Sequence, residues 1–303
     1  MLREYQVPNY LDPRTLAKLQ GLQLRAGQLV AGYVAGMHRS PRRGFSIEFA
    51  EHREYAPGDD LRYLDWKVFG RTDKHYLKQY EDETNLVCYL VVDVSESMQY
   101  RGSRAPWSKF DHAATAAGAL AWLVLQQQDA VGLVTFDEQV RDFISPASNP
   151  LQLKQILHVL ELASHRGKTQ LSRTLHELAD RLTSRGVVIL FSDFFDDVPA
   201  MLSGLTHLRH RRHEVIAFHT LDADELEFPF HRPTMFRGLE SLPQAMVEPR
   251  SLRQSYLKHF QRYREQFMEA CRGQQIDYQL LDTGQSLAIA LSTFLAHRRV
   301  RLR

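Results

Sequence analysis

Three oxygen-bearing side chains stand at every second position where an apolar run ends: Asp93, Ser95 and Ser97. The run before them, from Leu86 to Val92, is typical of a strand buried on both faces of a sheet. Alternate side chains of an extended segment share a side, so the three can converge beyond the carboxyl end of the strand, where open α/β sheets bind ligands. A purely oxygen donor set suits Mg²⁺ or another hard divalent cation such as Mn²⁺ or Ca²⁺.

Two more oxygen donors fall where a metal site at the same sheet edge would need them. Thr169 lies in a predicted loop before a helix, and Asp193 directly follows the apolar strand predicted from Val187 to Phe191. The alternative interpretation is that these side chains only satisfy loop backbone groups or cap a following helix. The predicted metal site therefore comprises Asp93, Ser95, Ser97, Thr169 and Asp193.

From residue 86 onward, strand and helix patterns alternate along the chain. Such alternation predicts an α/β fold with a mostly parallel sheet flanked by helices. After the strand that ends at Asp93, we expect strands at 130–136, 139–144, 187–191, 215–219 and 277–281. We expect helices at 109–128, 151–163, 171–184, 197–212, 251–273 and 286–297, with Ser251 as the cap of the fifth and an irregular or hairpin excursion over 222–248.

The first 84 residues have a different pattern and are expected to form a helical and β extension of the α/β domain, which spans 85–303. A helix is predicted within residues 1–36, and strands are predicted at Phe45–Phe49 and Tyr76–Tyr80. Between those strands lies Tyr55 to Trp66, a charged segment that contains the turn sequence Pro-Gly-Asp-Asp.

The composition excludes several protein classes. The 38 basic and 36 acidic residues leave a net charge of +2, which gives no reason to expect a nucleic-acid partner. The two cysteines, Cys88 and Cys271, lie in apolar patterns and do not indicate a disulfide framework. The longest uncharged stretch, 113–128, is shorter than the ~20 apolar residues of a membrane span, and no signal peptide is visible. We therefore expect a cytoplasmic protein without a membrane span.

The order Asp-x-Ser-x-Ser, then Thr, then Asp resembles the metal-ion-dependent adhesion site of von Willebrand factor A domains. In that family the two serines and the threonine contact Mg²⁺ directly, and the aspartates often act through water. Carried onto this chain, the resemblance implies that Ser95, Ser97 and Thr169 bind the metal, with Asp93 and Asp193 behind them. One coordination position can stay open for a Glu or Asp carboxylate of a protein partner, so the resemblance implies a binding module and not an enzyme.

A second motif, Tyr55-x-Pro57-Gly58-Asp59-Asp60-x-Arg62-x-x-Asp65-Trp66, resembles the signature of the bacterial family called domain of unknown function 58. Members carry an A-like domain after this signature and are commonly encoded beside MoxR-type AAA+ ATPases. The resemblance implies an adaptor or co-factor of such an ATPase in a chaperone-like or assembly role, with the ATPase or its client as partner. Many members have transmembrane helices, and this chain is expected to differ from them in that respect.

Two other functions are alternatives from the residues alone. A Mg²⁺-dependent phosphate-ester hydrolase would need further carboxylates near the metal, which Asp196 and Asp197 could supply. Binding of an anionic polymer would use the basic side chains of Arg42, Arg43, Arg209, Arg211 and the tail. A nucleotide-binding loop at Gly167-Lys168-Thr169 is not expected, because Leu162 stands where that loop needs its first glycine.

Overall fold

The computed structural model describes residues 47–54, 66–72, 75–82, 86–149, 151–165, 167, 169–239, 244–291 and 293–294. They form two compact units, one with the described residues up to Asp82 and one from Leu86 onward, and each is treated separately below. The helix predicted within residues 1–36, Tyr55 to Asp65 of the signature, Arg42, Arg43 and the basic tail all lie outside the described residues.

The smaller unit is built on an antiparallel pair of strands, β1 (Ile47–Glu54) and β2 (Tyr76–Asp82). Both strands were predicted, and each is longer than its alternating sequence pattern suggested. A short helix, α3 (Trp66–Thr72), lies between them in sequence. Trp66 is largely exposed and makes an edge-to-face ring contact with Phe69.

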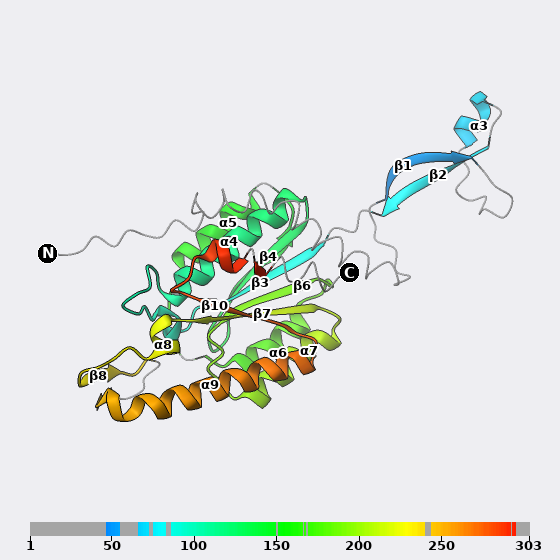
Figure 1. The fold of residues 1–303 in the computed structure, drawn as a ribbon. Coiled ribbons are helices and arrows are strands. Elements are labelled where there is room, and N and C mark those ends of the chain that lie inside the picture. The colour runs from blue at the N-terminus through cyan, green and yellow to red at the C-terminus, as the bar shows by residue number, and fades with distance from the viewer. Residues whose placement is uncertain are drawn as a thin grey trace. The chain divides into compact units, whose positions relative to one another are not determined.

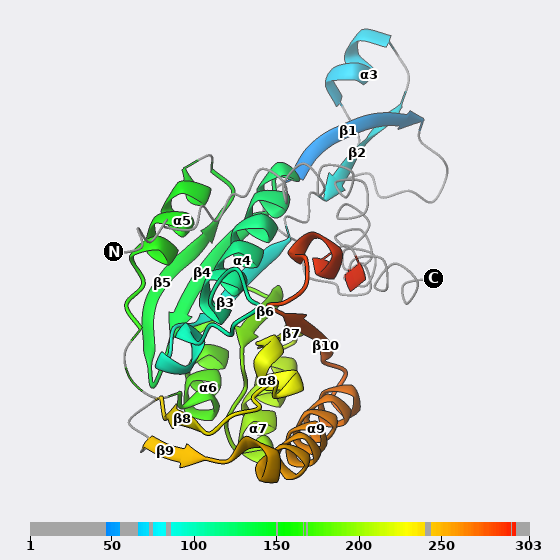
Figure 2. The same ribbon diagram turned by 60° about the vertical axis from the view of Figure 1, so that its left-hand side comes forward.

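The larger unit contains a six-stranded sheet with the order β10-β7-β6-β3-β4-β5 (Figures 1 and 2). All neighbouring strands are parallel except the edge strand β5, which pairs antiparallel with β4. This arrangement confirms the predicted α/β fold with a mostly parallel sheet. The strands are β3 (Val87–Asp93), β4 (Ala130–Phe136), β5 (Val140–Ala147), β6 (Val187–Ser192), β7 (Glu214–Leu221) and β10 (Asp277–Asp282).

Helices cover both faces of this sheet (Figures 1 and 2). One face carries α4 (Lys109–Gln126), α5 (Gln152–Leu162) and the helical residues between 287 and 294. The other carries α6 (Leu171–Arg181), α7 (Val198–His210) and α9 (Pro249–Gly273), whose apolar side chains pack with Tyr89 and Val91 of β3 in one core. Because both faces are covered, β3 and β6 are buried along nearly their whole length, which explains their continuous apolar sequences.

The excursion predicted over residues 222–248 contains a short helix and a hairpin. The helix is α8 (Ala223–Glu227), and the hairpin pairs β8 (Thr234–Arg237) antiparallel with β9 (Gln244–Val247). The prediction that Ser251 caps the next helix is wrong, because α9 begins at Pro249 after Glu248. Proline has no backbone N–H and its fixed φ suits the first helical turn, so the helix starts three residues earlier than a cap at Ser251 would place it.

Both cysteines are buried, Cys88 in β3 and Cys271 in α9.

The strand order places a topological switch point between β3 and β6. From β3 the chain continues to β4 and β5 on one side, and it then returns to β6 on the other side of β3. The connections that leave β3 and β6 therefore diverge outside the carboxyl ends of these two strands, which is where open α/β sheets bind ligands. Asp93 ends β3 and Asp193 follows β6, so the fold brings the two predicted aspartates to this switch point.

A candidate metal centre at the ends of strands β3 and β6

Asp93 is completely buried, and both of its carboxylate oxygens accept hydrogen bonds. The Ser95 N–H donates to Oδ1 at 2.9 Å, and the hydroxyl of Ser192 donates to Oδ2 at 2.5 Å. Ser192 is the last residue of β6, and its oxygen also accepts a bond from the Phe194 N–H at 3.0 Å. The carboxylate at the end of β3 is thus held in place by the end of the neighbouring strand.

The two predicted serines lie in the turn that follows β3. Ser95 is the residue before a short 3₁₀ helix, η2 (Glu96–Gln99), and its hydroxyl lies 3.0 Å from that of Ser97. After the larger effects of burial and of Lys109, Ser97 lowers the pKa of the Asp193 carboxyl. Four of the five predicted residues, Asp93, Ser95, Ser97 and Asp193, therefore lie close together, and the first three are joined by hydrogen bonds.

The loop that carries the fifth predicted residue, Thr169, lies against the serine turn. The Glu96 N–H, between the two serines, donates to the Gly167 carbonyl at 3.3 Å. Gly167 has a φ of +90°, a left-handed conformation that residues with a side chain rarely adopt, so glycine suits this position. Thr169 itself is half-buried two residues further on.

The backbone just after Asp193 is turned sharply. Phe194 has a φ of 51°, which is uncommon for a bulky residue and costs of order 1–3 kcal/mol. Its ring is fully buried and lies 4.8 Å from that of Phe267, and the Tyr263 hydroxyl donates to the carbonyls of Phe194 and Asp196. Packing and hydrogen bonds from α9 thus hold the turn that positions Asp193.

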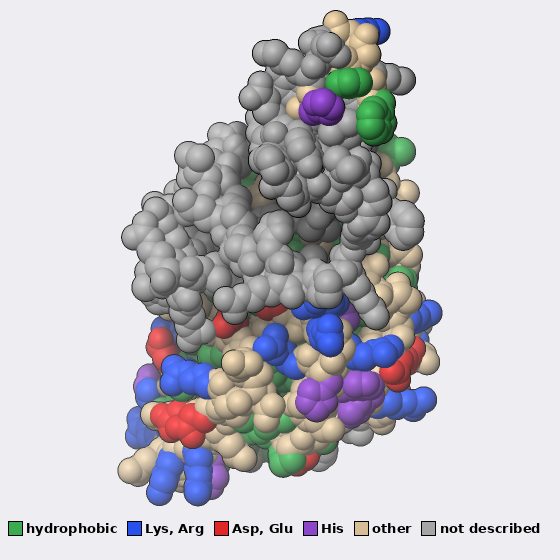
Figure 3. Space-filling view, turned by 90° about the vertical axis from the view of Figure 1, so that its right-hand side faces the viewer, with side chains coloured by type: hydrophobic (Ala, Val, Ile, Leu, Met, Phe, Trp, Pro, Cys, Tyr) green, Lys and Arg blue, Asp and Glu red, His purple; other side chains and the backbone are tan. Residues whose placement is uncertain are grey.

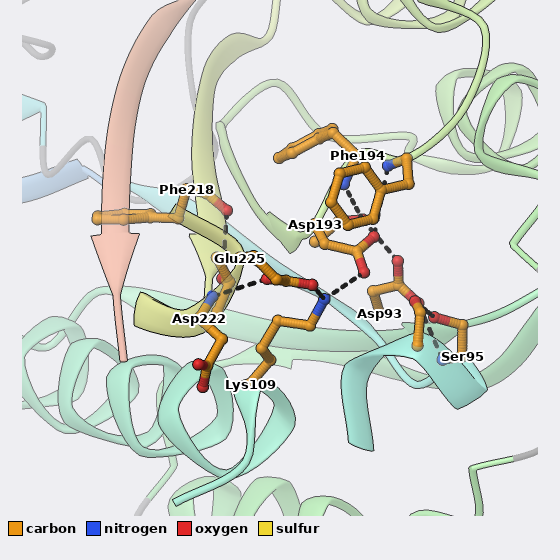
Figure 4. A network of polar contacts seen from close by, with 12 residues as sticks. Asp93, Ser95, Lys109, Asp193, Phe194, Phe218, Asp222 and Glu225 are labelled. Atoms are coloured by element: carbon orange, nitrogen blue, oxygen red, sulfur yellow. Dashed lines mark hydrogen bonds and ion pairs between the residues drawn. The ribbon is translucent and has the colours of Figure 1, made fainter. Parts of the chain in front are cut away.

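Lys109 is a member of the site that the sequence did not reveal (Figure 4). Its side chain is 1% exposed, and its ammonium lies 2.8 Å from Oδ2 of Asp193 and 2.8 Å from Oε1 of Glu225. Lys109 is the first residue of α4, after the cap Ser108, and Glu225 lies in α8, where its other oxygen accepts the Asp222 N–H. A lysine in the first turn of a helix opposes the helix dipole. That unfavourable position was the one signal in the sequence that could have marked Lys109.

The buried charges of this group do not cancel. With all groups ionised, the carboxylates of Asp93, Asp193 and Glu225 face the single ammonium of Lys109. Burial and then the charge of Asp193 raise the pKa of Asp93 to about 7. Burial alone would lower the pKa of Lys109 and raise that of Asp193, but their mutual attraction outweighs burial, so the lysine pKa is raised and the aspartate pKa is lowered. The site therefore carries an excess of negative charge.

The donor set fits a hard divalent cation. It offers hydroxyl and carboxylate oxygens only, and its uncompensated negative charge would favour a cation. The hydroxyls of Ser95, Ser97 and Thr169 are the candidate direct ligands. The two aspartates are already engaged by Ser192, by Lys109 and by the serine turn, which suits carboxylates that act through water. Within the described ranges, no group of three or more His, Cys, Asp or Glu side chains could hold a metal ion. A metal site in this part of the chain would thus depend on hydroxyl oxygens.

The carboxylates that a hydrolase would need are used by the backbone instead. Asp196 accepts hydrogen bonds from the Leu171 N–H at 3.1 Å and from the Asp197 N–H at 2.7 Å. Asp197 caps α7 by accepting the Ala200 N–H at 2.9 Å. Both side chains therefore have structural roles at the starts of α6 and α7.

The basic residues of the polymer-binding alternative have local partners as well. Arg209 donates to the carbonyl of His213 and to Gln275, and Arg211 donates to the carbonyl of Ala179. Figure 3 shows the described Lys and Arg side chains of one face separated by acidic, histidine and uncharged side chains. The described part of this face does not present the continuous basic surface that phosphate-backbone binding uses.

Fold and site together define an α/β domain with a cluster of buried oxygen-bearing side chains at the switch point of its sheet. The chain belongs to the family described as protein of unknown function DUF58, whose model matches residues 51–266. It is also similar to uncharacterized proteins of Mycobacterium bovis and Mycobacterium tuberculosis, each 26% identical over 296 residues, with 95% of this chain and 91% of the relative covered.

Three solved structures show weaker likeness. An aerotolerance-related membrane protein from Bacteroides fragilis is 14% identical, with a TM-score of 0.45 over 70% of this chain and 99% of that one. BatB from Bacteroides thetaiotaomicron is 14% identical, with a TM-score of 0.44 and coverages of 71% and 99%. The SpRpn10 VWA domain is 12% identical, with a TM-score of 0.40 and coverages of 69% and 95%.

The prediction of a cytoplasmic location is corrected by these comparisons. The similar structure from Bacteroides fragilis is that of a membrane protein, and another, from Vibrio fischeri, is that of a membrane-spanning protein. Within the ranges that the structure describes, no helix combines the length and the apolar character needed to cross a bilayer.

Proposed function

We propose that this chain is a Mg²⁺-dependent protein-interaction module. The observation that carries the proposal is the convergence of two buried aspartates and two hydroxyls at the switch point, with an excess of negative charge. Ser95, Ser97 and Thr169 would bind the metal directly, and Asp93 and Asp193 would interact with it through water. When bound, the metal supplies an electrophilic contact for a carboxylate.

The partner of such a site is a protein that presents a Glu or Asp side chain. The ligands offered by this chain include neutral hydroxyls, so the metal would retain enough positive charge to attract a further carboxylate. Membership of the DUF58 family makes a MoxR-type AAA+ ATPase, or its client, the proposed partner, with this chain as adaptor or co-factor in a chaperone-like or assembly role. The structural roles of Asp196 and Asp197 favour binding over phosphate-ester hydrolysis.

The first test is thermal unfolding of the wild type and of the Ser95→Ala/Ser97→Ala variant, with Mg²⁺ and with chelator. A ligand at about 100 times its Kd stabilises a protein by about 2.7 kcal/mol. At this chain length that corresponds to a rise in Tm of about 5–10 °C. We expect the rise in the wild type and not in the double variant. The exposed Ser203→Ala is the matched control and should respond as the wild type does. An equal response in all three proteins would contradict the assignment of the site.

The second test concerns the partner. We expect the chain to bind a MoxR-type ATPase from the same organism in Mg²⁺, and we expect chelator or Ser95→Ala/Ser97→Ala to abolish that binding. Replacing Glu and Asp side chains of the ATPase one at a time should identify the carboxylate that reaches the metal. If the ATPase binds equally well in chelator, then its binding does not depend on the metal site.

A further inference from the structure

The ammonium of Lys109 lies between the carboxylates of Asp193 and Glu225 (Figure 4). The lysine side chain extends from α4, and Glu225 reaches the same ammonium from α8. The lysine and Asp193 are each 1% exposed, so water does not screen their attraction. The ring of Phe195 lies 5.1 Å from the ammonium and further shields it.

This contact gives the site a cation of its own. A divalent metal held by Ser95 and Ser97 would approach Asp193, because that carboxylate lies beside Asp93, which accepts the Ser95 N–H (Figure 4). The same carboxylate is already paired with an ammonium at 2.8 Å. In a buried site, a second positive charge at the same carboxylate is opposed by the first. Glu225 provides a second position for the ammonium, at an equal distance of 2.8 Å.

We propose that Lys109 is the residue that sets the metal affinity of this site, by competing with the divalent cation for the carboxylate of Asp193. The inference rests on the proposed function, since it concerns the same metal. Lys109 holds Asp193 in the metal-free protein, and it is drawn toward Glu225 when the metal is bound. The site therefore binds Mg²⁺ more weakly than its oxygen ligands alone would allow, and it stays folded without metal.

Two variants separate direct competition from a general effect of charge. Lys109→Met removes the ammonium and keeps an unbranched side chain, but it also makes the site more negative by one charge. Lys109→Met/Glu225→Gln removes one positive and one negative charge, so its formal charge equals that of the wild type. Lys154→Met, in which an exposed lysine of α5 is replaced, is the control for loss of a lysine elsewhere.

The measurement is the Mg²⁺ Kd by titration calorimetry, with the Tm in Mg²⁺ and in chelator as a second readout. We expect Lys109→Met to lower the Kd at least tenfold, and the charge-matched double variant to lower it at least fivefold, while Lys154→Met leaves it unchanged. If the double variant binds Mg²⁺ no more tightly than the wild type, competition at Asp193 is overturned, even if Lys109→Met binds more tightly.

The outcomes also distinguish this inference from the proposed function. In one outcome, Ser95→Ala/Ser97→Ala loses Mg²⁺ binding, while the wild type and Lys109→Met/Glu225→Gln bind Mg²⁺ with equal affinity. This outcome would support the proposed function and overturn the inference. In another outcome, Lys109→Met/Glu225→Gln binds Mg²⁺ and the wild type does not. This outcome would support the inference and overturn the Mg²⁺ dependence of the native protein. If Lys109→Met does not fold in chelator, the charge-matched double variant decides the question, because it also removes one of the two carboxylates that the lost ammonium had neutralised.

Discussion

The hydroxyl of Ser192 donates a 2.5 Å hydrogen bond to the carboxylate of Asp93, and so the end of β6 fixes the side chain at the end of β3. The same oxygen accepts the N–H of Phe194, the residue with the left-handed backbone. The buried Ser192 thus connects Asp93 to the turn that follows Asp193.

The first prediction concerns this serine. Ser192→Ala leaves a buried carboxylate oxygen and a buried N–H without their partner, which costs about 1–3 kcal/mol for each group. We expect the free energy of unfolding to fall by at least about 2 kcal/mol in urea titrations at constant m-value. Ser203→Ala, at an exposed site, should change it by less than about 0.5 kcal/mol. A fall in the Ser192 variant no larger than that of the control would show that the bond to Asp93 contributes little.

The second prediction tests how α9 supports the site. Tyr263→Phe removes the hydroxyl that donates to the carbonyls of Phe194 and Asp196, while the ring can still pack. We expect a loss of about 1–2 kcal/mol in stability and faster hydrogen exchange of the amides of residues 194–197. Exchange in β4, which is remote from this contact, serves as the internal reference. Unchanged exchange at 194–197 would show that the turn is held by packing alone.

The third prediction concerns the loop between the serine turn and α4. A Cβ on Gly102 would lie 2.0 Å from Oδ1 of Asp222. That carboxylate cannot easily move, because Oδ2 accepts bonds from the Gly102 N–H and the Thr283 hydroxyl, and Oδ1 accepts the Asp224 N–H. We expect Gly102→Ala to destabilise the protein by about 1–3 kcal/mol.

The matched control is Gly273→Ala at the end of α9, where a Cβ would meet nothing within 4 Å. Calorimetry should show a lower Tm for the Gly102 variant and an unchanged or slightly higher Tm for the Gly273 variant. Equal Tm values for the two variants would mean that the 99–108 loop adapts to the added methyl group.

The fourth prediction concerns pH. Burial raises the pKa of Asp129 to about 6, against an ordinary value near 3.8, although Oδ1 accepts the Leu86 N–H at 2.9 Å. Between these two values the folded protein binds more protons at this group than the unfolded chain does. The contribution of Asp129 to stability therefore falls as pH rises from about 4 to about 6, and the loss persists above that range.

Asp129→Asn removes this titration and can keep the bond from Leu86. We expect the variant to be more stable than the wild type at pH 7, by at most about 3 kcal/mol, and the difference to shrink toward pH 4. Urea unfolding across this pH range measures it. A difference that does not depend on pH would exclude titration of Asp129 as its cause.

The sequence predicted those parts of the fold whose patterns reflect burial. The strands from Val87 to Asp93, from Ala130 to Phe136 and from Val187 to Ser192 are buried on both faces, and so their apolar runs stood out. The hairpin strands β8 and β9 pair only with each other and leave Met235 and Met246 exposed, so a burial pattern could not mark them.

The same reasoning applies to the site. Strand order brings Asp93, Ser95, Ser97 and Asp193 together because each stands at a recognisable strand end or turn. No signal in the sequence marked Ser192, and only the unfavourable first-turn position marked Lys109, since their roles depend on contacts across the sheet and between helices. The ammonium of Lys109 pairs with Asp193 and with Glu225, and Glu225 lies in α8, a helix that the sequence analysis did not predict.

The ion pair between Lys109 and Glu225 also has a consequence for synthesis of the chain. The two residues are 116 positions apart, so the lysine emerges from the ribosome long before its second partner exists. If the nascent domain buried α4 before residue 225 was made, the ammonium of Lys109 would be buried without the carboxylate of Glu225. The structure thus favours a domain that completes its interior only after α8 has been made, and shortened chains that end before residue 225 should be poor folding units.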